Sequence, residues 1–328
     1  MTPRENYLKV LRGETPEFVP SFYEPFTDTI WLDYYVKPSY APDGFNFSPW
    51  GVRYVGSKDL NFGGIPEPNF IILRDIRQWR DVIKNPDVRD VDFERYYNKS
   101  LEGRDRENLA LIAVGGEYFQ TLVSFMGFSE ALMAMHEEPE EVYALLDYIS
   151  EYSMGIARQK IRYTKPDIYM VSDDCAAAKA PFFSLDMYKR LIKPFHAKHA
   201  ALAIEHGIAV TKHDCGKSEQ FIDDWLDIGI SGWNPAQPMN DLPAIKRKYG
   251  ARLTIDGGCW DYITAGRDLS DDDALIAAVD EYVATFAPGG GFIFAAMPPF
   301  DPANMEDFGR RNELVRKYFF DKIRNYYN

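Results

Sequence analysis

The most constraining feature of this chain is a regular alternation of short apolar runs with helical patterns, which starts near residue 80. Each run closes on small or polar residues, as buried strands do where they pass into loops. The runs occupy residues 109–114, 168–171, 208–211, 230–233, 253–255 and 292–294. The helical patterns lie near residues 129–136, 139–162, 184–206, 219–227, 241–249 and 271–286. Strands that alternate with helices predict an α/β fold built on a parallel sheet.

The N-terminal part of the chain departs from this alternation. Residues 4–13 predict a short amphipathic helix, and residues 18–22 predict a first strand. Residues 24–80 are rich in aromatics, Pro and Gly, with short β-like pieces at 50–55 and 70–73. We interpret this stretch as an elaborated loop with a hairpin or two, since a long insertion with its own aromatics is more often a functional lid than a disordered segment.

The number of strands decides whether the sheet can close. Together with residues 18–22, seven strands are recognisable, whereas a closed barrel needs eight. We expect the eighth strand within the insertion or within residues 80–107. No repeat, low-complexity tract or linker divides the chain, so residues 1–328 are expected to form a single domain.

Polar side chains and cysteines collect where the predicted strands end. In barrel enzymes the carboxyl ends of the strands carry the active site, whereas the opposite end serves stability. These ends hold Glu117, Asp173, Asp174, Cys175, His213, Asp214, Cys215, Asn234, Asp256 and Cys259. The remaining histidines fall in helical patterns, where surface or packing roles are the simplest interpretation: His136, His196, His199 and His206.

His213 and Cys215 are the clearest candidates for a metal site. Because they lie two residues apart, both side chains point to the same face of an extended backbone. An imidazole together with a thiolate suits Zn²⁺. The rest of the ligand set is open, and the candidates are Cys175, Cys259, Asp173 and Glu219. The structural alternative is a buried cysteine beside a hydrogen-bonded histidine.

Two further motifs at strand ends have both a chemical and a structural interpretation. Asp173 and Asp174 can cap a helix, or one of them can have a raised pKa in a closed site and donate a proton near neutral pH. Gly257 and Gly258 allow a large ligand or partner to approach the backbone closely, and a tight turn explains them equally well. The three glycines at 289–291 precede a strand and lack a following Lys-Ser/Thr, so they predict a helix-ending turn and not a phosphate loop.

Charge and cysteine content narrow the range of partners. The formal charge of −13 disfavours nucleic acid and anionic membranes, because both require a basic face. Three cysteines are too few and too scattered for a disulfide framework. No signal peptide or membrane span is recognisable, so we expect a cytoplasmic protein whose reduced thiols are free to bind metal or to react.

The layout resembles the uroporphyrinogen decarboxylase superfamily and, within it, the corrinoid-dependent methyltransferases. The similarity extends over nearly the whole chain, and its strongest motifs are His213-Asp-Cys-Gly216, Trp233-Asn-Pro-Ala-Gln-Pro-Met-Asn-Asp241 and Ile255-Asp-Gly-Gly258. Supporting motifs are residues 4–20, Trp50-Gly51, residues 122–132, and Ser172-Asp-Asp174 followed by Pro181-Phe-Phe-Ser184. The run Ala176-Ala-Ala-Lys-Ala-Pro181 is most similar to veratrol- or vanillate-type O-demethylase methyltransferases.

This resemblance implies a (β/α)₈ TIM barrel with an N-terminal insertion. It implies an enzyme that takes a methyl group from a methoxylated aromatic and passes it to Co(I) of a separate corrinoid protein. Zinc-dependent relatives use a His-x-Cys pair plus a later cysteine. His213 and Cys215 match the pair, but residues 294–299 contain no cysteine, which favours the demethylating half-reaction. A homodimer is one of the assemblies that the resemblance allows.

On this hypothesis His213, Asp173 or Asp174 polarises or protonates the ether oxygen, directly or through Zn²⁺ that Cys215 also holds. We expect the following residues to bind the substrate: Tyr23, Trp31, Glu117, Tyr118, Phe119, Trp233, Asn234, Asp256 and Trp260. One alternative is a decarboxylase or lyase acting on an aromatic or tetrapyrrole acid, whose arginine-rich N-terminal segment has no counterpart near residues 20–45. The other is a non-catalytic accessory protein that binds a corrinoid or a substrate.

Overall fold

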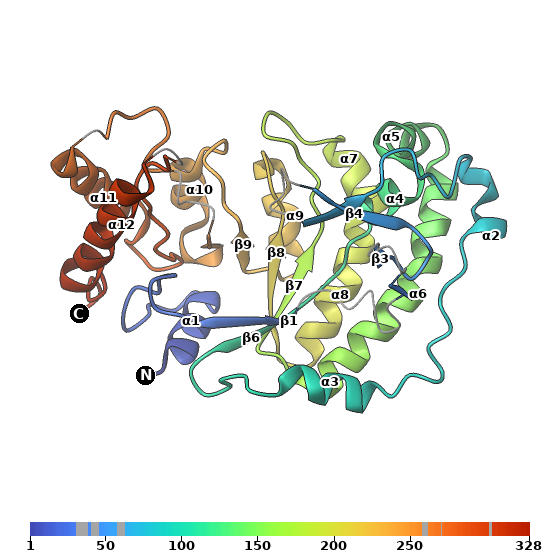
Figure 1. Ribbon diagram of the computed structural model, residues 1–328, viewed down its shortest axis with the longest axis horizontal. Helices are drawn as coiled ribbons and strands as arrows, with labels where there is room; N and C mark the ends of the chain where they lie inside the picture. The colour runs from blue at the N-terminus through green and yellow to red at the C-terminus, as the bar shows by residue number, and fades with distance from the viewer. Residues whose placement is uncertain (31–38, 41–45, 58–62, 258–261, 270, 302–303) are drawn as a thin grey trace.

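A parallel sheet of six strands, in the order β1-β6-β7-β8-β9-β10, forms the centre of the protein (Figure 1). The computed structural model describes residues 1–30, 39–40, 46–57, 63–257, 262–269, 271–301 and 304–328. The strands are β1 (Thr27–Ile30), β6 (Ala110–Gly115), β7 (Ile168–Ser172), β8 (Ala209–His213), β9 (Gly232–Asn234) and β10 (Thr254–Ile255). β6 and β7 are buried along their whole length, as expected of strands covered on both faces.

Two further segments continue the sheet beyond β10 through single parallel bridges. Ile255 bridges Phe292, and Phe294 bridges Ser21. The backbone N–H of Phe294 donates to the carbonyl oxygen of Pro20 at 2.8 Å. Eight parallel segments therefore follow one another around a (β/α)₈ barrel, and the predicted α/β barrel is confirmed. The predicted strand at residues 18–22 is reduced to the bridge at Ser21, because the chain turns there and Glu24 N–H donates to the Ser21 carbonyl.

β1 is the strand that could not be recognised in the sequence, and it lies inside the stretch interpreted as an insertion. It pairs in register with β6, from Thr27 opposite Ala110 to Ile30 opposite Ala113. Its apolar signal is weak because Thr27 and Thr29 line a cavity. On its other face, Asp28 forms an ion pair with Arg104.

The rest of the insertion forms a four-stranded antiparallel sheet in the order β2-β3-β4-β5. Its strands are β2 (Ser39–Tyr40), β3 (Asn46–Phe47), β4 (Arg53–Ser57) and β5 (Gly63–Pro66). The β-like piece expected at 50–55 overlaps β4. The piece expected at 70–73 is not a strand, because its N–H groups at Ile72 and Leu73 both donate to the carbonyl of Phe125 in a helix.

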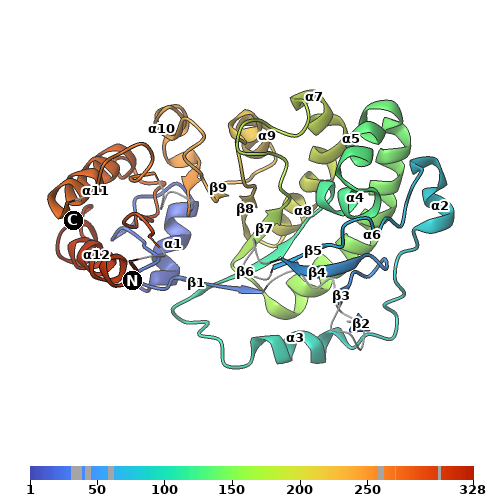
Figure 2. The same ribbon diagram turned by 45° about the horizontal axis from the view of Figure 1, so that its top comes forward.

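Helices surround the barrel in two groups (Figures 1 and 2). One group covers β6, β7 and β8: α3 (Phe93–Leu101), α4 (Phe119–Met126), α5 (Phe128–Glu137), α6 (Pro139–Thr164), α7 (Leu185–Met187), α8 (Lys193–Glu205) and α9 (Ile222–Asp227). The other contains α1 (Pro3–Leu11), α10 (Leu242–Tyr249), α11 (Asp272–Phe286) and α12 (Met305–Tyr318), and the short α2 (Trp79–Val82) lies at the edge. Among the described residues, no helix has the length and apolar character to cross a membrane.

The helix expected at 184–206 is divided. A π-helical turn (Tyr188–Ile192) separates α7 from α8. Pro194 stands in the first turn of α8, and because it has no N–H group a regular helix cannot run through it. The remaining predicted helices correspond to observed ones, and the glycines at 289–291 form a turn between α11 and the segment 292–294, as predicted.

Candidate active site

Two neighbouring strands bring the predicted site residues together. In the parallel register of β7 and β8, Ser172 lies opposite His213, so the loops that follow both strands start side by side. Asp173 and Asp174 belong to the first loop, and Asp214 and Cys215 belong to the second. The carboxyl ends of the strands thus carry the titratable side chains, as in barrel enzymes.

Asp174, His213 and Cys215 form a compact group of possible metal ligands. One ligand atom from each residue lies within 4.8 Å of the other two. His213 Nε2 is 3.8 Å from Asp174 Oδ1 and 3.8 Å from Cys215 Sγ. The Asp174 carboxylate is held by the backbone N–H of Cys215 (2.8 Å) and by Gln120 Nε2 (3.1 Å). A carboxylate, an imidazole and a thiol are a donor set that suits Zn²⁺.

Asn234, at the end of β9, fixes the orientation of the His213 ring. Its side chain hydrogen-bonds to the carboxylate of Asp256, which can only accept, so the amide nitrogen must face Asp256. The amide oxygen then faces His213 and lies 3.3 Å from Nδ1. The proton therefore sits on Nδ1, and the lone pair of Nε2 points toward Asp174 and Cys215.

The ionisation of the group also fits a cation. Burial lowers the pKa of His213, which favours the neutral imidazole that binds metals. Burial, assisted by the charge of Asp174, raises the pKa of Cys215 to about 12. A divalent cation between these groups would reverse that effect and stabilise the thiolate.

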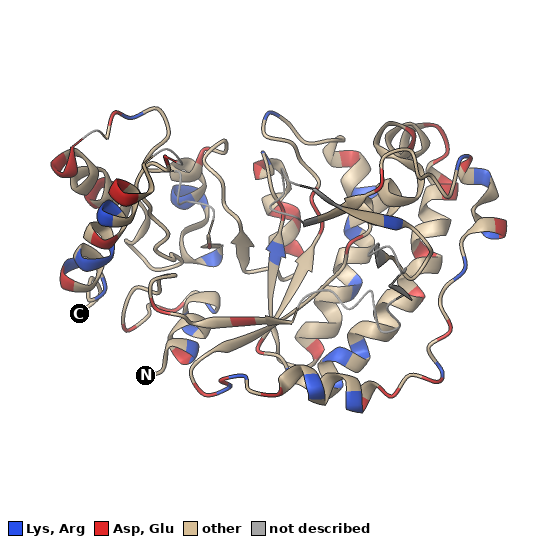
Figure 3. Ribbon diagram, viewed as in Figure 1, with Lys and Arg blue, Asp and Glu red and all other residues tan. Residues whose placement is uncertain are grey.

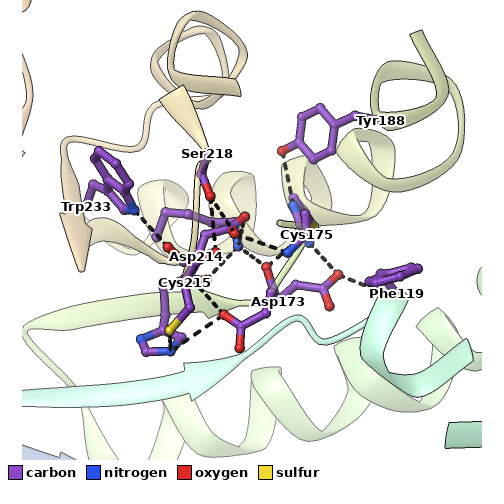
Figure 4. Close-up of polar contacts among 12 residues, drawn as sticks. Phe119, Asp173, Cys175, Tyr188, Asp214, Cys215, Ser218 and Trp233 are labelled. Atoms are coloured by element: carbon purple, nitrogen blue, oxygen red, sulfur yellow. Dashed lines mark hydrogen bonds and ion pairs between the residues drawn. The ribbon is translucent and has the colours of Figure 1, made fainter. Parts of the chain in front are cut away.

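Asp173 faces away from this group and organises the start of α4 (Figure 4). Its fully buried carboxylate accepts the backbone N–H groups of Tyr118, Phe119 and Gln120 at 2.9–3.1 Å. His196 Nε2 lies 3.1 Å from the same carboxylate. Burial would raise the pKa of Asp173, but His196 and Lys212 outweigh it, so the pKa is lowered.

A buried lysine, Lys212, connects the loops that follow β7 and β8 through hydrogen bonds to their backbone carbonyls. Lys212 Nζ donates to the carbonyl oxygens of Asp173 and His213, both at 2.7 Å, and lies 3.4 Å from Asp214 Oδ2. Burial would lower the pKa of Lys212, but the acidic groups around it, Asp214 foremost, raise it. Asp214 in turn accepts from the backbone N–H of Cys175 and from the Ser218 hydroxyl (Figure 4).

The loop after Cys215 depends on a glycine and on the motif at residues 233–241. Gly216 has φ +93°, and a Cβ there would lie 2.6 Å from the carbonyl oxygen of Ala176. Gln237 Oε1 accepts the Gly216 N–H at 2.7 Å, and Asn240 Nδ2 donates to the Gly216 carbonyl at 2.9 Å. The polar residues of the motif therefore position the loop that carries Cys215.

The donor group opens into a cavity of about 740 Å³, which we call the first chamber. Asp174, His213 and Cys215 lie in its wall, together with Glu117 and Gln120. Its aromatic lining comes from the insertion and from the barrel loops: Trp50, Tyr54, Phe119, Phe128 and Phe182. The described residues of its wall include no Lys or Arg.

The expected substrate-binding residues are divided among several places. Glu117 and Phe119 line the first chamber, whereas Asn234 and Asp256 line a second cavity on the other side of His213. Tyr118 and Trp233 are buried in the core, where they contact His199 and the Asp214 carbonyl. Tyr23 hydrogen-bonds to Asn312 and lines neither chamber. Trp31, Trp260 and the candidate ligand Cys259 lie outside the described residues.

Of the other candidate metal ligands, three are engaged elsewhere, and Asp173 at the start of α4 is the first of them. The buried Cys175 thiol donates to the Asp173 carbonyl, and Glu219 accepts the backbone N–H of Asp241. Gly257 packs against Asn234, since a Cβ there would lie 2.6 Å from Asn234 Nδ2. This contact within the chain already requires a glycine at 257.

Sequence reasoning missed several residues of the site. Lys212 looked like one polar residue in an apolar run, and His196 and His199 looked like ordinary helix residues, yet all three are fully buried. Gln120, Phe128 and Phe182 also escaped notice as site residues. Gln120 was recognisable only as a polar residue in an otherwise apolar helix start, and the two phenylalanines gave no signal that separated them from the core.

The fold and the site define a (β/α)₈-barrel protein with a polar, metal-competent group at the carboxyl ends of its strands. The sequence model of the family described as Uroporphyrinogen decarboxylase (URO-D) matches residues 72–296, more than half of the chain. The chain therefore belongs to the uroporphyrinogen decarboxylase family. No curated protein matches the sequence.

One solved structure has the same fold over nearly the full length of both chains. It is a methyltransferase from Methanosarcina mazei, 15% identical, with a TM-score of 0.58, covering 98% of this chain and 99% of that one. At this identity the likeness establishes the fold alone.

Proposed function

We propose that this protein is a methyltransferase that removes a methyl group from a methoxylated aromatic and passes it to Co(I) of a separate corrinoid protein. The observation that carries the proposal is the Asp174–His213–Cys215 group, which faces an aromatic-lined chamber of about 740 Å³. The chamber has the size and the mixed apolar and polar lining of a small-molecule site. The methyltransferase of the same fold supports this choice of reaction.

The aromatic side chains of the first chamber bind the ring of the donor. Phe119, Phe128 and Phe182 pack against one another with ring centroids 4.9–6.3 Å apart. Trp50 packs edge-on against Phe125, with ring centroids 5.7 Å apart, and adds an aromatic residue of the insertion to the wall. Flat rings held in this way provide apolar area and stacking partners for a flat substrate.

An aryl ether is inert because phenolate is a poor leaving group, so its oxygen must be polarised while the methyl carbon is attacked. Asp174, His213 and Cys215 would hold Zn²⁺ at the wall of the chamber. Bound there, the ion supplies Lewis acidity to the ether oxygen. In this chain Asp174 takes the place of the later cysteine that is absent from residues 294–299.

The two neighbouring aspartates have different roles in this proposal. Asp174 faces the chamber and holds the cation. The Asp173 carboxylate instead accepts hydrogen bonds from three backbone N–H groups and contacts His196. We therefore assign Asp173 a positioning role, and His213 and Asp174 remain the candidates for direct participation. Neutral His213 presents Nε2 because Asn234 holds the proton on Nδ1.

A decarboxylase acting on a polycarboxylate fits the first chamber poorly. A polyanionic substrate needs basic partners, but the described wall holds Glu117 and Asp174 and no Lys or Arg. A neutral methoxylated ring meets no such difficulty.

The proposal is tested by mixing the protein with a Co(I)-corrinoid protein and a panel of methoxyaromatics, and following methyl-Co(III) by absorbance. We expect His213→Ala to slow methyl transfer by at least about 10²-fold, the lower range for a lost general acid or Lewis acid. The matched control is His206→Ala, which removes an exposed histidine and should transfer at the normal rate. Near-normal transfer by His213→Ala, with its fold verified by circular dichroism, would overturn the assignment.

A further inference from the structure

A second chamber of about 510 Å³ lies on the other side of Asn234 from the donor group. Its walls are formed by β1, by the middle of β6, β7 and β8, by the ends of β9 and β10, and by residues 293–297. It therefore reaches into the interior of the barrel, and it shares no lining residue with the first chamber. Asn234 stands between the two, because it lines the second chamber while its amide oxygen contacts the His213 ring of the first. A cavity of this size is large enough for a small organic ligand, given the roughly 300–1,000 Å³ of typical ligand pockets.

Asp256 places an ionisable carboxyl in the wall of this chamber. Asp256 is partly buried, and it contributes to the lining of the chamber. Its two donors, the Tyr7 hydroxyl at 2.6 Å and the Asn234 amide, are both neutral. Burial raises the pKa of Asp256 to about 6, so the group is still mainly ionised at neutral pH.

The described wall offers no positive charge to balance this carboxylate. It contains no Lys, Arg or His, and its remaining polar side chains are the hydroxyls of Thr27, Thr29 and Thr211. A charge in such surroundings is costly unless it is paired, and hydrogen bonds from neutral donors compensate only part of that cost. A positively charged ligand would supply the missing partner.

Aromatic side chains make up much of the rest of the wall. The chamber is lined by the aromatic side chains of Tyr7, Phe22, Phe26 and Phe294. The ring centroids of Tyr7 and Phe26 lie 4.6 Å apart in an edge-to-face arrangement. Aromatic rings attract cations through their negative faces, and the attraction is strongest where the cation is desolvated. Aromatic rings beside one carboxylate are the usual means of recognising alkylammonium groups.

We infer that the second chamber is a binding site for a small organic cation of the quaternary or tertiary ammonium class, with its charge facing Asp256. This site is separate from the one that holds the methoxylated ring, and the inference does not depend on the proposed methyl transfer. Occupancy would bring a ligand against Asn234 and thereby next to the residue that orients His213.

Choline and its neutral isostere 3,3-dimethylbutan-1-ol, which differ in charge but hardly in shape, provide the test. Isothermal titration calorimetry of the full-length protein should give one choline site, and the isostere should bind at least about tenfold more weakly, since charge and cation–π attraction are lost. Equal binding of the two compounds, or no binding of choline at millimolar concentration, would overturn the inference.

Variants locate the site. Asp256→Asn, which keeps the shape and removes the charge, should weaken choline binding by at least about tenfold. Thr29→Met places a larger side chain in the chamber and keeps Asp256 itself, and it should also weaken choline binding, so the inference remains testable if Asp256→Asn folds poorly. Glu117→Gln removes a carboxylate from the first chamber and should leave binding unchanged. If Glu117→Gln weakens choline binding and Asp256→Asn does not, the cation belongs to the first chamber and the inference is wrong.

Discussion

At the scale of single residues, Asn234 is the neighbour that tunes the proposed metal site. Hydrogen-bond partners of metal-binding histidines fix the ring and its tautomer, and their loss typically costs about 10–100-fold in metal affinity. We expect Asn234→Ala to weaken Zn²⁺ binding within that range, measured by competition with a chromophoric chelator. Asn108→Ala, an exposed asparagine far along the chain, is the control. Unchanged Zn²⁺ affinity in Asn234→Ala would show that the amide does not orient the imidazole.

The residue scale also shows where sequence reasoning ends. His213 and Cys215 were recognisable as a pair because alternate residues of an extended strand share a face. The sequence could not show which of Asp173 and Asp174 faces the possible metal site. That depends on α4, because the N–H groups at its start donate hydrogen bonds to the Asp173 carboxylate. Cys175 and Glu219 could be set aside as ligands only once their contacts with the Asp173 carbonyl and the Asp241 N–H were known.

At the scale of elements, Asp173 joins β7 to α4 and α8. It satisfies three N–H groups at the start of α4 and contacts His196 of α8. Asp173→Asn would set an amide nitrogen against these donors, so we expect the free energy of unfolding to fall by about 3 kcal/mol. Urea denaturation measures this change. Asp271→Asn is the control, because Asp271 is an exposed helix cap and Asn caps a helix equally well. A loss at position 173 no larger than at position 271 would contradict the role of Asp173.

The same scale explains which elements the sequence could predict. The strands buried on both faces are continuous apolar runs and were found, as were the long helices between them. β1 was missed because Thr27 and Thr29 face a chamber and Asp28 pairs with Arg104, so no apolar run marks it. The strand that lines the second chamber is therefore the one whose sequence least resembles a barrel strand.

At the scale of the whole molecule, the net charge disfavoured nucleic acid and anionic membranes as partners. It did not indicate where on the protein a ligand would bind. Acidic and basic residues are interspersed over the helices (Figure 3), and the excess of 50 acidic over 37 basic residues gives the net charge. The two chambers favour different ligands. The first combines aromatic rings with the possible metal ligands Asp174, His213 and Cys215, whereas the second combines aromatic rings with the carboxylate of Asp256, which no positive charge in the described wall balances. The separation into two chambers depends on which strands are neighbours in the barrel. The spacing of residues along the sequence therefore could not predict it.

Buried histidines should make the stability of the whole molecule depend on pH in a defined direction. His199 contacts the hydroxyls of Tyr118, Tyr169 and Ser153, and burial, with nearby positive charges, lowers its pKa from 6.5 to about 3. Below pH 6.5 His199 becomes protonated in the unfolded chain but stays neutral in the folded chain. The free energy of unfolding therefore decreases as the pH falls. By about pH 4 this loss should reach about 3 kcal/mol.

The contribution of His199 is best isolated as a difference between two proteins. The buried carboxyls Asp214 and Asp256 have pKa values that burial raises, so they favour folding as pH falls and mask the histidine in the wild type alone. His199→Gln keeps a hydrogen-bonding side chain that does not titrate in this range. At pH 7 the variant should be less stable than the wild type, because its contacts are imperfect. Toward pH 4 that deficit should shrink by about 3 kcal/mol, measured by urea denaturation at several pH values. A deficit that stays constant across this range would mean that His199 titrates alike in the folded and unfolded chains.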